Sequence, residues 1–287
     1  MRRGKRQLRF YEDLSALEKA QVRQSQRQKL RKSKRVDGWG LKNEVTRVYV
    51  REKIELGWSP QIIANRIGMD KQGQSISHES IYQYIYHQAK ELIKDLPRKG
   101  KSRGINRASG RRPRAVEESK RSIELRPVKA NLRGEPGHWE SDLIVSARHG
   151  KSSLLVLVDR QNRHLHLRLL PNRQAHTVRQ ALFTILQAQV KKTLTVDNGP
   201  EHQELAFLEP VFADNDFKIY FCHPYCAWER GTVEAINGIL RRFFPKKTNF
   251  DEVTAQQVQN VQDWFNHRPM KVLGYLTPLE YESKMAA

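Results

Sequence analysis

Three acidic side chains occupy positions from which a folded chain could assemble one site. Asp142 lies within an apolar run, Asp197 follows a second apolar run, and Glu234 lies in a stretch with helical periodicity. Carboxylate oxygens are hard ligands of the kind that Mg²⁺ and Mn²⁺ prefer, so three converging carboxylates would suit such ions. Their convergence depends on the elements that carry them.

Asp142 lies in the middle of a predicted strand, residues 138–145. Side-chain alternation predicts two faces, one with His138, Glu140 and Asp142 and the other with Trp139, Ser141 and Leu143. An unpaired charge is costly to bury, so an acid in so apolar a strand needs a partner.

Asp197 and Glu234 are less distinctive when each is taken alone. Asp197 begins an Asp-Asn-Gly sequence, which often forms only a turn, and a lone helical Glu is usually a solvated surface residue. Asp197 nevertheless ends a predicted strand, where open α/β sheets build their sites. The helix predicted from about Gly231 would present Glu234, Asn237 and Arg241 along one side.

The elements around these residues follow an α/β order. Strands are predicted at residues 138–145, 153–158, 165–170, 193–196 and 218–222, and helices at 175–190, 204–213, from about 231 and from about 254. This is the order of a ribonuclease-H-like domain, a mixed five-stranded sheet with helices on both faces. The three acids then fall at the first strand, the fourth strand and the following helix.

Upstream, residues 42–97 are predicted to form a small all-α module. The first helix should end near Gly57, the second should open at Ser59 and Pro60 and stop at Gly68, and the third should start at Ser77 or His78. The expected apolar faces are Val45, Val48, Tyr49 and Ile54, then Ile62, Ile63 and Ile67, then Ile81, Tyr82, Ile85 and Tyr86.

Three such helices resemble a helix-turn-helix fold, whose last helix enters the major groove. Ser80, Gln83 and His87 are the polar residues expected to contact bases or phosphates. Residues 36–97 hold 8 basic and 8 acidic side chains, so a helical bundle used for dimerisation is an alternative for this module.

The positive charge is concentrated outside the predicted folded regions. The chain carries a net charge of +21, and residues 1–35 and 98–133 each hold 13 basic and 3 acidic side chains. Clustered Lys and Arg bind phosphate backbones by releasing counterions, which favours nucleic acid as a partner over a merely solubilising role. We therefore predict a basic arm at 1–35, a basic linker at 98–133 and a catalytic core at 134–287.

The cysteines and hydropathy indicate a cytosolic protein. Two cysteines are too few for a disulfide framework, and no apolar run is long enough to cross a membrane. Cys222, His223 and Cys226 lack the second ligand pair that a structural zinc site needs.

Several motifs together carry a resemblance to a known family. They are Gly137-His-Trp-Glu-Ser-Asp-Leu-Ile, Val196-Asp-Asn-Gly, Pro224-Tyr-Cys-Ala-Trp-Glu-Arg-Gly-Thr-Val-Glu, Asn237-Gly-Ile-Leu-Arg-Arg-Phe-Phe-Pro-Lys, and Asn266-His-Arg-Pro-Met-Lys-Val-Leu-Gly-Tyr-Leu-Thr-Pro-Leu-Glu. Residues 134–282 resemble the DDE transposases and integrases with a ribonuclease-H-like core, most closely the bacterial insertion-sequence family called IS thirty.

The resemblance implies a DNA transposase with Asp142, Asp197 and Glu234 as catalytic and metal-binding residues. Two Mg²⁺ or Mn²⁺ ions about 4 Å apart would activate a water or 3′-hydroxyl and stabilise the leaving oxygen, so one site could cut element ends and transfer strands. The expected partners are double-stranded DNA, as terminal inverted repeats and target, and further copies of the chain in a homo-oligomer at the bacterial nucleoid. Supporting or DNA-contacting roles are expected of His138, Glu140, Asn198, Arg230, Asn237 and Arg241.

The chain also departs from the family pattern. Val233 and Ala235 flank Glu234 where asparagines are usual, and 36 residues separate Asp197 from Glu234, which predicts a small insertion near residues 208–215. Members usually begin with a further helix-turn-helix, whereas this sequence opens on the basic stretch. A non-catalytic DNA-binding regulator and a ribonuclease-H-type nuclease without joining activity are the alternatives.

Overall fold

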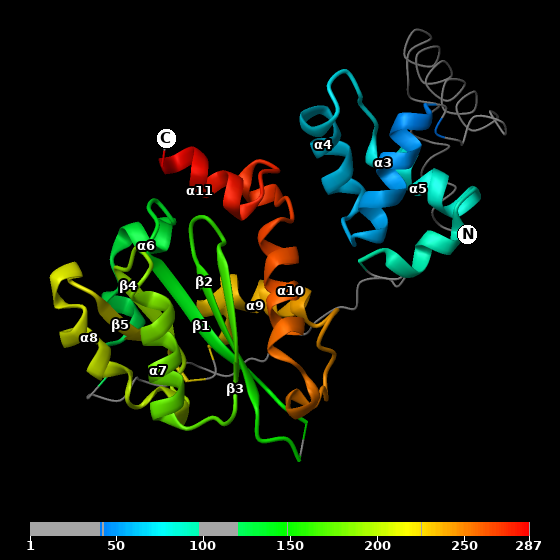
Figure 1. The fold of residues 1–287 in the computed structure, drawn as a ribbon. Coiled ribbons are helices and arrows are strands. Elements are labelled where there is room, and N and C mark those ends of the chain that lie inside the picture. Colours follow the sequence, from blue (N-terminus) through cyan, green and yellow to red (C-terminus); the bar gives the residue numbers. More distant parts are fainter. Residues whose placement is uncertain (1–40, 42, 98–119, 148, 225, 287) are drawn as a thin grey trace, which may run out of the picture. The chain divides into compact units, whose positions relative to one another are not determined.

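The computed structural model describes residues 41, 43–97, 120–147, 149–224 and 226–286 (Figure 1). The chain divides into two compact units, residues 1–103 and 104–287. The predicted basic arm at 1–35 and most of the predicted linker, residues 98–119, lie outside the described residues.

Among the residues that the structure describes, the N-terminal unit forms three α-helices and a 3₁₀ segment. They are α3 (Glu44–Glu55), α4 (Pro60–Asp70), α5 (His78–His87) and η2 (Lys90–Asp95). The hydroxyl of Ser59 accepts the N–H of Ile62, and Pro60 occupies the first position of α4, as the sequence predicts. Ser77 caps α5 in the same way.

The apolar faces of α3 and α5 are rotated from those predicted. Val45 and Val48 are 53% and 54% exposed, while Thr46, Tyr49, Val50 and Ile54 are buried. In α5, Tyr82 and Tyr86 are exposed, and the buried residues are Ile81, Tyr84 and Ile85. Each helix buries one stripe at i, i+3 and i+4, and contacts from the other helices decide which stripe that is. Helix α4 also continues past Gly68, because a single glycine is tolerated within a helix.

The C-terminal unit is built on a five-stranded sheet. Its strands are β1 (His138–Val145), β2 (Ser153–Asp159), β3 (Leu165–Leu170), β4 (Thr193–Val196) and β5 (Lys218–Phe221). They lie in the order β3-β2-β1-β4-β5, in which β1 to β3 are antiparallel and β1, β4 and β5 are parallel. The mixed ribonuclease-H-like sheet that the sequence predicts is confirmed.

Helices cover both faces of this sheet (Figure 1). On one face, α7 (Ala175–Leu186) and α8 (Leu208–Val211) pack on a core that includes Trp139 and Leu143. On the other, α9 (Gly231–Leu240), α10 (Ala255–Asn266) and α11 (Pro278–Ala286) pack on a core that includes Ile144 and Val156. Strand alternation thus divides β1 between two cores.

Two predicted helices are shorter than expected. Helix α7 ends at Leu186, and the carbonyl of Val190 instead accepts the indole N–H of Trp139 at 2.9 Å. In place of a helix at 204–213, the chain forms η5 (Leu205–Phe207), α8 and η6 (Ala213–Asn215). Pro210 explains the interruption, because it lacks an N–H and would break a helix that had begun at 204.

Residues 120–133, predicted as part of an extended linker, pack against the sheet instead. They form η3 (Ile123–Leu125) and α6 (Val128–Leu132), and Ser122 forms a β-bridge with Phe221. The Arg126 guanidinium donates to the Thr195 hydroxyl at 3.1 Å. Within the described parts of the chain, no helix is long and apolar enough to cross a membrane.

Candidate active site

Asp142 and Asp197 lie on neighbouring parallel strands. Strands β1 and β4 pair with Glu140 opposite Thr195, and the chain reaches an aspartate two residues further along each. The parallel register therefore brings the two carboxylates to the same level of the sheet, where β4 ends.

One guanidinium group lies between these carboxylates. Arg230 donates from Nη1 to Asp142 Oδ1 at 2.9 Å and from Nη2 to Asp197 Oδ2 at 3.2 Å. Its Nη1 also donates to the backbone carbonyl of Ser141 at 3.0 Å, and its side chain is 9% exposed. Burial lowers the pKa of Arg230, but the charges of Asp142 and Asp197 raise it further, so the net shift is upward and the side chain stays charged.

Helix α9 brings two further predicted residues to this place. Asn237 donates from Nδ2 to Asp142 Oδ2 at 2.7 Å, so both oxygens of this carboxylate have partners. Glu234 comes four residues after Arg230 and three before Asn237, which places it on the same side of α9. It is exposed and forms no hydrogen bond or ion pair with any residue that the structure describes.

The second oxygen of Asp197 is held from the following turn. Asp197 Oδ1 contacts His202 Nδ1 at 2.7 Å and accepts the N–H of Gly199 at 3.0 Å. Burial raises the pKa of Asp197, but the hydrogen bond and charge of His202, the charge of Arg230 and the Gly199 N–H together bring it well below its usual value. Asp197 is therefore ionised, and its Oδ2 faces Arg230.

His202 was not among the sequence candidates, although it contacts Asp197 and is only 1% exposed. It follows Asp197 by five residues, in Asp-Asn-Gly-Pro-Glu-His, a spacing that belongs to no regular element. The turn formed by η4 (Pro200–His202) folds it back onto Asp197. A histidine soon after a candidate metal ligand was the available signal.

The residues at this edge of the sheet fit a hard divalent cation. Asp142 and Asp197 direct carboxylate oxygens at one cationic group, so the place is already suited to positive charge. Asp197, Glu201 and His202 also bring one potential ligand atom each to within 4.8 Å of one another. Because Asp197 Oδ1 is engaged by His202, the oxygens nearest Arg230 are the better candidates for metal ligands.

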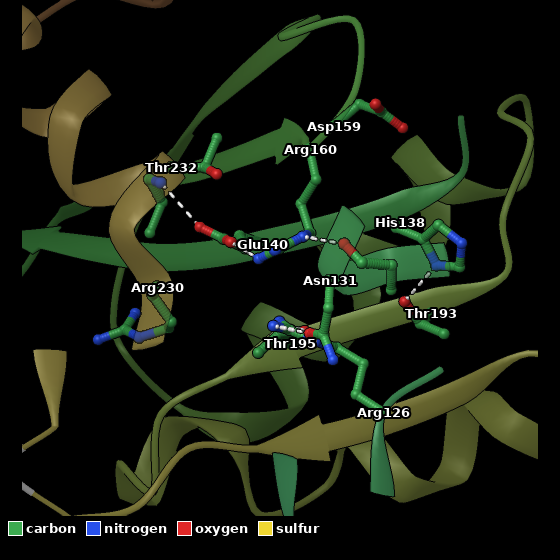
Figure 2. A network of polar contacts seen from close by, with 12 residues as sticks. Arg126, Asn131, His138, Glu140, Asp159, Arg160, Thr193, Thr195, Arg230 and Thr232 are labelled. Carbon is green, nitrogen blue, oxygen red and sulfur yellow. Dashed lines mark hydrogen bonds and ion pairs between the residues drawn. The ribbon is translucent and has the colours of Figure 1, made fainter. Parts of the chain in front are cut away.

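Glu140 is buried and connects the sheet to α9 (Figure 2). Its carboxylate pairs with Arg160 and accepts the backbone N–H of Val233 at 2.9 Å. Arg160 in turn donates to the carbonyl of Ala130 in α6 at 2.9 Å. Glu140 thus supports the start of the helix that carries Glu234 and has no exposed surface through which to contact DNA.

Three other predicted residues form their described contacts with groups other than the two aspartates. His138, at the start of β1, contacts Thr193 Oγ1 at 2.8 Å, four residues from Asp142 along the strand. Asn198 donates to the carbonyl of Cys222 and joins the ends of β4 and β5. The side chain of Arg241 lies near the carbonyls of Phe244 and Pro245 beyond the end of α9.

A cavity of about 270 Å³ opens beside Asp197. It is lined by Asp197, Asn198, Gly199, Cys222, His223, Pro224, Cys226 and Arg230. Burial raises the pKa of Cys222 to about 12, so this thiol stays protonated and is a poor metal ligand. The side chain of His223 is bonded to Glu229 at 2.7 Å, which also disfavours zinc binding here.

In the N-terminal unit, Ser80, Gln83 and His87 lie along one side of α5. Gln83 and His87 are exposed, and Ser80 is half-buried with its hydroxyl 2.9 Å from that of Ser77. The exposed rings of Tyr82 and Tyr86 stack beside them, 6.1 Å apart.

Comparison with known proteins places this geometry in a family. Residues 133–227 match the integrase core domain. The chain is 33% identical over 249 residues to the transposase for insertion sequence element IS1086 of Cupriavidus metallidurans, an alignment that covers 83% of this chain and 72% of the relative. The chain belongs to the IS30 family of transposases.

Further members show similar agreement. The transposase for IS4351 of Bacteroides fragilis is 34% identical over 233 residues, covering 79% of this chain and 69% of the relative. The transposase InsI for IS30A of Escherichia coli is 33% identical over 257 residues, covering 82% of this chain and 63% of the relative. The similarity therefore extends beyond the integrase core to most of the chain.

Proposed function

We propose that this transposase cleaves DNA at the ends of its insertion sequence and joins those ends to target DNA. Asp142, Asp197 and Glu234 would hold two Mg²⁺ or Mn²⁺ ions. The observation that supports this most directly is the placement of Asp142 and Asp197 on adjacent parallel strands, with their carboxylates on opposite sides of one cation. Glu234 lies beside them on α9, exposed and without a partner in the described chain.

The surrounding residues prepare this site for phosphodiester chemistry. When bound, the divalent ions would help to deprotonate an attacking hydroxyl and stabilise the leaving oxygen. Asn237 orients Asp142, and His202 with the Gly199 N–H orients Asp197, so these ligands are positioned before substrate arrives. Cleavage and joining differ only in the attacking hydroxyl, which belongs to water in the first and to a DNA 3′ end in the second. The same carboxylates therefore serve both steps without a covalent protein intermediate.

The proposed partner is double-stranded DNA, as terminal repeats and as target. The net charge of +21 supports a polyanionic partner. Ser80, Gln83 and His87, on the accessible side of α5, are proposed to contact the repeat, with affinity supplied by the basic stretches of the sequence. Since two element ends must be joined in one reaction, we propose a homo-oligomer.

The test uses the full chain, Mn²⁺ and labelled duplexes that carry the element's terminal repeats. The wild type should nick the end and join it to a second duplex, and Asp197→Asn should reduce both activities by about a thousandfold or more. Retention of both activities in Asp197→Asn would show that the assigned site is wrong. Nicking without joining would identify a nuclease, and repeat binding without either activity would identify a regulator.

A further inference from the structure

Arg230 is held mainly by the carboxylates that are proposed to bind metal. Its terminal nitrogens lie 2.9 and 3.2 Å from oxygens of Asp142 and Asp197, and one of them also donates to the Ser141 carbonyl. Its Nε is buried without a hydrogen-bond partner in the described chain. The side chain is therefore held chiefly by its two ion pairs, with one additional hydrogen bond to the Ser141 carbonyl.

Metal binding and this arrangement use the same oxygens. Mg²⁺ would bind carboxylate oxygens at about 2.0–2.1 Å, closer than the guanidinium nitrogens now lie. The guanidinium lies between Asp142 Oδ1 and Asp197 Oδ2, so it occupies the space in which a metal ion bound to both oxygens would lie. Either Arg230 or the metal can be the close partner of Asp142 Oδ1 and Asp197 Oδ2.

The surroundings give Arg230 room to leave. It lines the 270 Å³ cavity beside Asp197, and it is the N-cap residue of α9, at the junction with η7 (Ala227–Arg230). Its backbone (φ −109°, ψ 41°) lies outside the helical region. A change of side-chain rotamer at this junction could therefore move the guanidinium toward the cavity while Val233 keeps its bond to Glu140.

We propose that Arg230 is the resident counter-cation of the Asp142–Asp197 pair, and that the divalent ions must displace it to bind. This inference rests on the proposed function of the two aspartates. Arg230 holds like-charged carboxylates together in the metal-free protein and weakens the affinity of the site for metal. It is a positioning residue that sets the metal concentration at which the site fills.

The test measures metal binding directly. Isothermal titration with Mn²⁺ compares the full-length wild type with Arg230→Gln, which removes the charge. Arg230→Gln should bind Mn²⁺ at least tenfold more tightly than the wild type. It should melt at a lower temperature than the wild type without metal, because two partly buried carboxylates lose their counter-ion, and saturating Mn²⁺ should remove this difference.

A matched control separates contact from overall charge. Arg241→Gln makes the same charge change at the opposite cap of α9, where the Arg241 side chain lies near the carbonyls of Phe244 and Pro245. Its Mn²⁺ affinity should stay within about twofold of the wild type. If Arg241→Gln tightens binding as much as Arg230→Gln, general electrostatics explains the effect and the inference is wrong.

Two further measurements keep the inference testable if Arg230→Gln folds poorly. Arg230→Lys keeps one charge but cannot bridge both aspartates as a guanidinium does, so it should bind Mn²⁺ more tightly than the wild type and less tightly than Arg230→Gln. In the wild type, titration with Mg²⁺ should shift the ¹⁵N signal of the Arg230 Nε–H, identified by its absence in Arg230→Lys. An unmoved signal at saturating Mg²⁺ would overturn displacement.

The outcomes also distinguish this inference from the proposed function. If Asp197→Asn loses Mn²⁺ binding while Arg230→Gln binds like the wild type or more weakly, the metal site stands and the counter-cation role is wrong. If Asp142→Asn and Asp197→Asn both bind Mn²⁺ like the wild type, the metal assignment itself fails, and the role of Arg230 fails with it.

Discussion

Glu140 accepts the backbone N–H of Val233 at 2.9 Å, so the middle of β1 is bonded to the first turn of α9. The same carboxylate pairs with Arg160 and is fully buried. Glu234, one residue after Val233, is exposed and has no partner in the described chain. Glu140 thus supports the helix that carries Glu234. Substitution of Glu140 should lower stability, whereas substitution of Glu234 should lower cleavage with little change in stability.

Glu140→Ala should lower the free energy of unfolding by about 3–5 kcal/mol, because it leaves the Arg160 charge buried without its partner. Urea denaturation followed by circular dichroism measures the change. Glu140→Gln, which can still accept the Val233 N–H, should lose less. A loss below about 1 kcal/mol in Glu140→Ala would contradict a structural role.

Glu234→Gln should leave stability within about 0.5 kcal/mol of the wild type, because the side chain is exposed and makes no described contact. Strand cleavage should nevertheless fall by about a hundredfold or more, because the substitution removes a proposed metal ligand. Single-turnover cleavage of an end duplex with Mn²⁺ measures it. Cleavage within threefold of the wild type would remove Glu234 from the site.

His202→Leu should weaken Mn²⁺ binding or cleavage about 10- to 100-fold, because Asp197 loses the group that orients Oδ1. His202→Asn keeps a donor near the position of Nδ1 and should recover part of the loss. Mn²⁺ titration of both variants beside the wild type measures the effect. Equal affinities in all three proteins would show that the His202 contact does not matter for the metal.

Acidification should destabilise the protein through His166, which lies beside the rings of Trp139 and His164. Burial and the charge of His164 lower the pKa of His166 from 6.5 to about 4. As pH falls, His166 is therefore protonated in the unfolded chain before it is protonated in the folded protein. The stability that neutral His166 contributes is fully present above pH 6.5 and is lost as pH falls toward 4, by about 3 kcal/mol.

Urea denaturation at intervals from pH 7.5 to 4.5 tests this dependence. His166→Phe keeps the ring volume without the titrating group and should have a shallower loss of stability with falling pH. His176→Gln replaces an exposed histidine of α7 and should retain the wild-type slope. Parallel slopes in the wild type and His166→Phe would assign the pH dependence to other groups.

Gln83→Ala should weaken binding to the terminal repeat by about 1–3 kcal/mol while leaving binding to unrelated DNA nearly unchanged, if Gln83 contacts a base edge. Gln61→Ala removes another exposed glutamine of the same unit, on α4, and serves as the control. Fluorescence anisotropy at fixed salt measures both. Equal weakening on both DNAs would indicate a phosphate contact.

The alternation of residues 138–145 by itself placed Glu140 and Asp142 on one face of a strand, because side-chain direction in a strand depends only on position along the chain. The Ser59-Pro60 helix start and the positions of the strands along the chain were predictable for the same reason, since caps, turns and periodicity are local. The rotated stripes of α3 and α5 were not, because the neighbouring helices select which side of a helix is buried.

The partners of the acids depended on tertiary structure. The local sequence placed Glu140 in an apolar strand and Glu234 on a helix, but their partners follow from the packing of α9 against β1. Arg230 reaches Asp142 across 88 positions, and His202 reaches Asp197 through an irregular turn. The sequence determined which residues could do chemistry, and long-range packing decided which charges face one another, because contacts between distant segments form only in the folded chain.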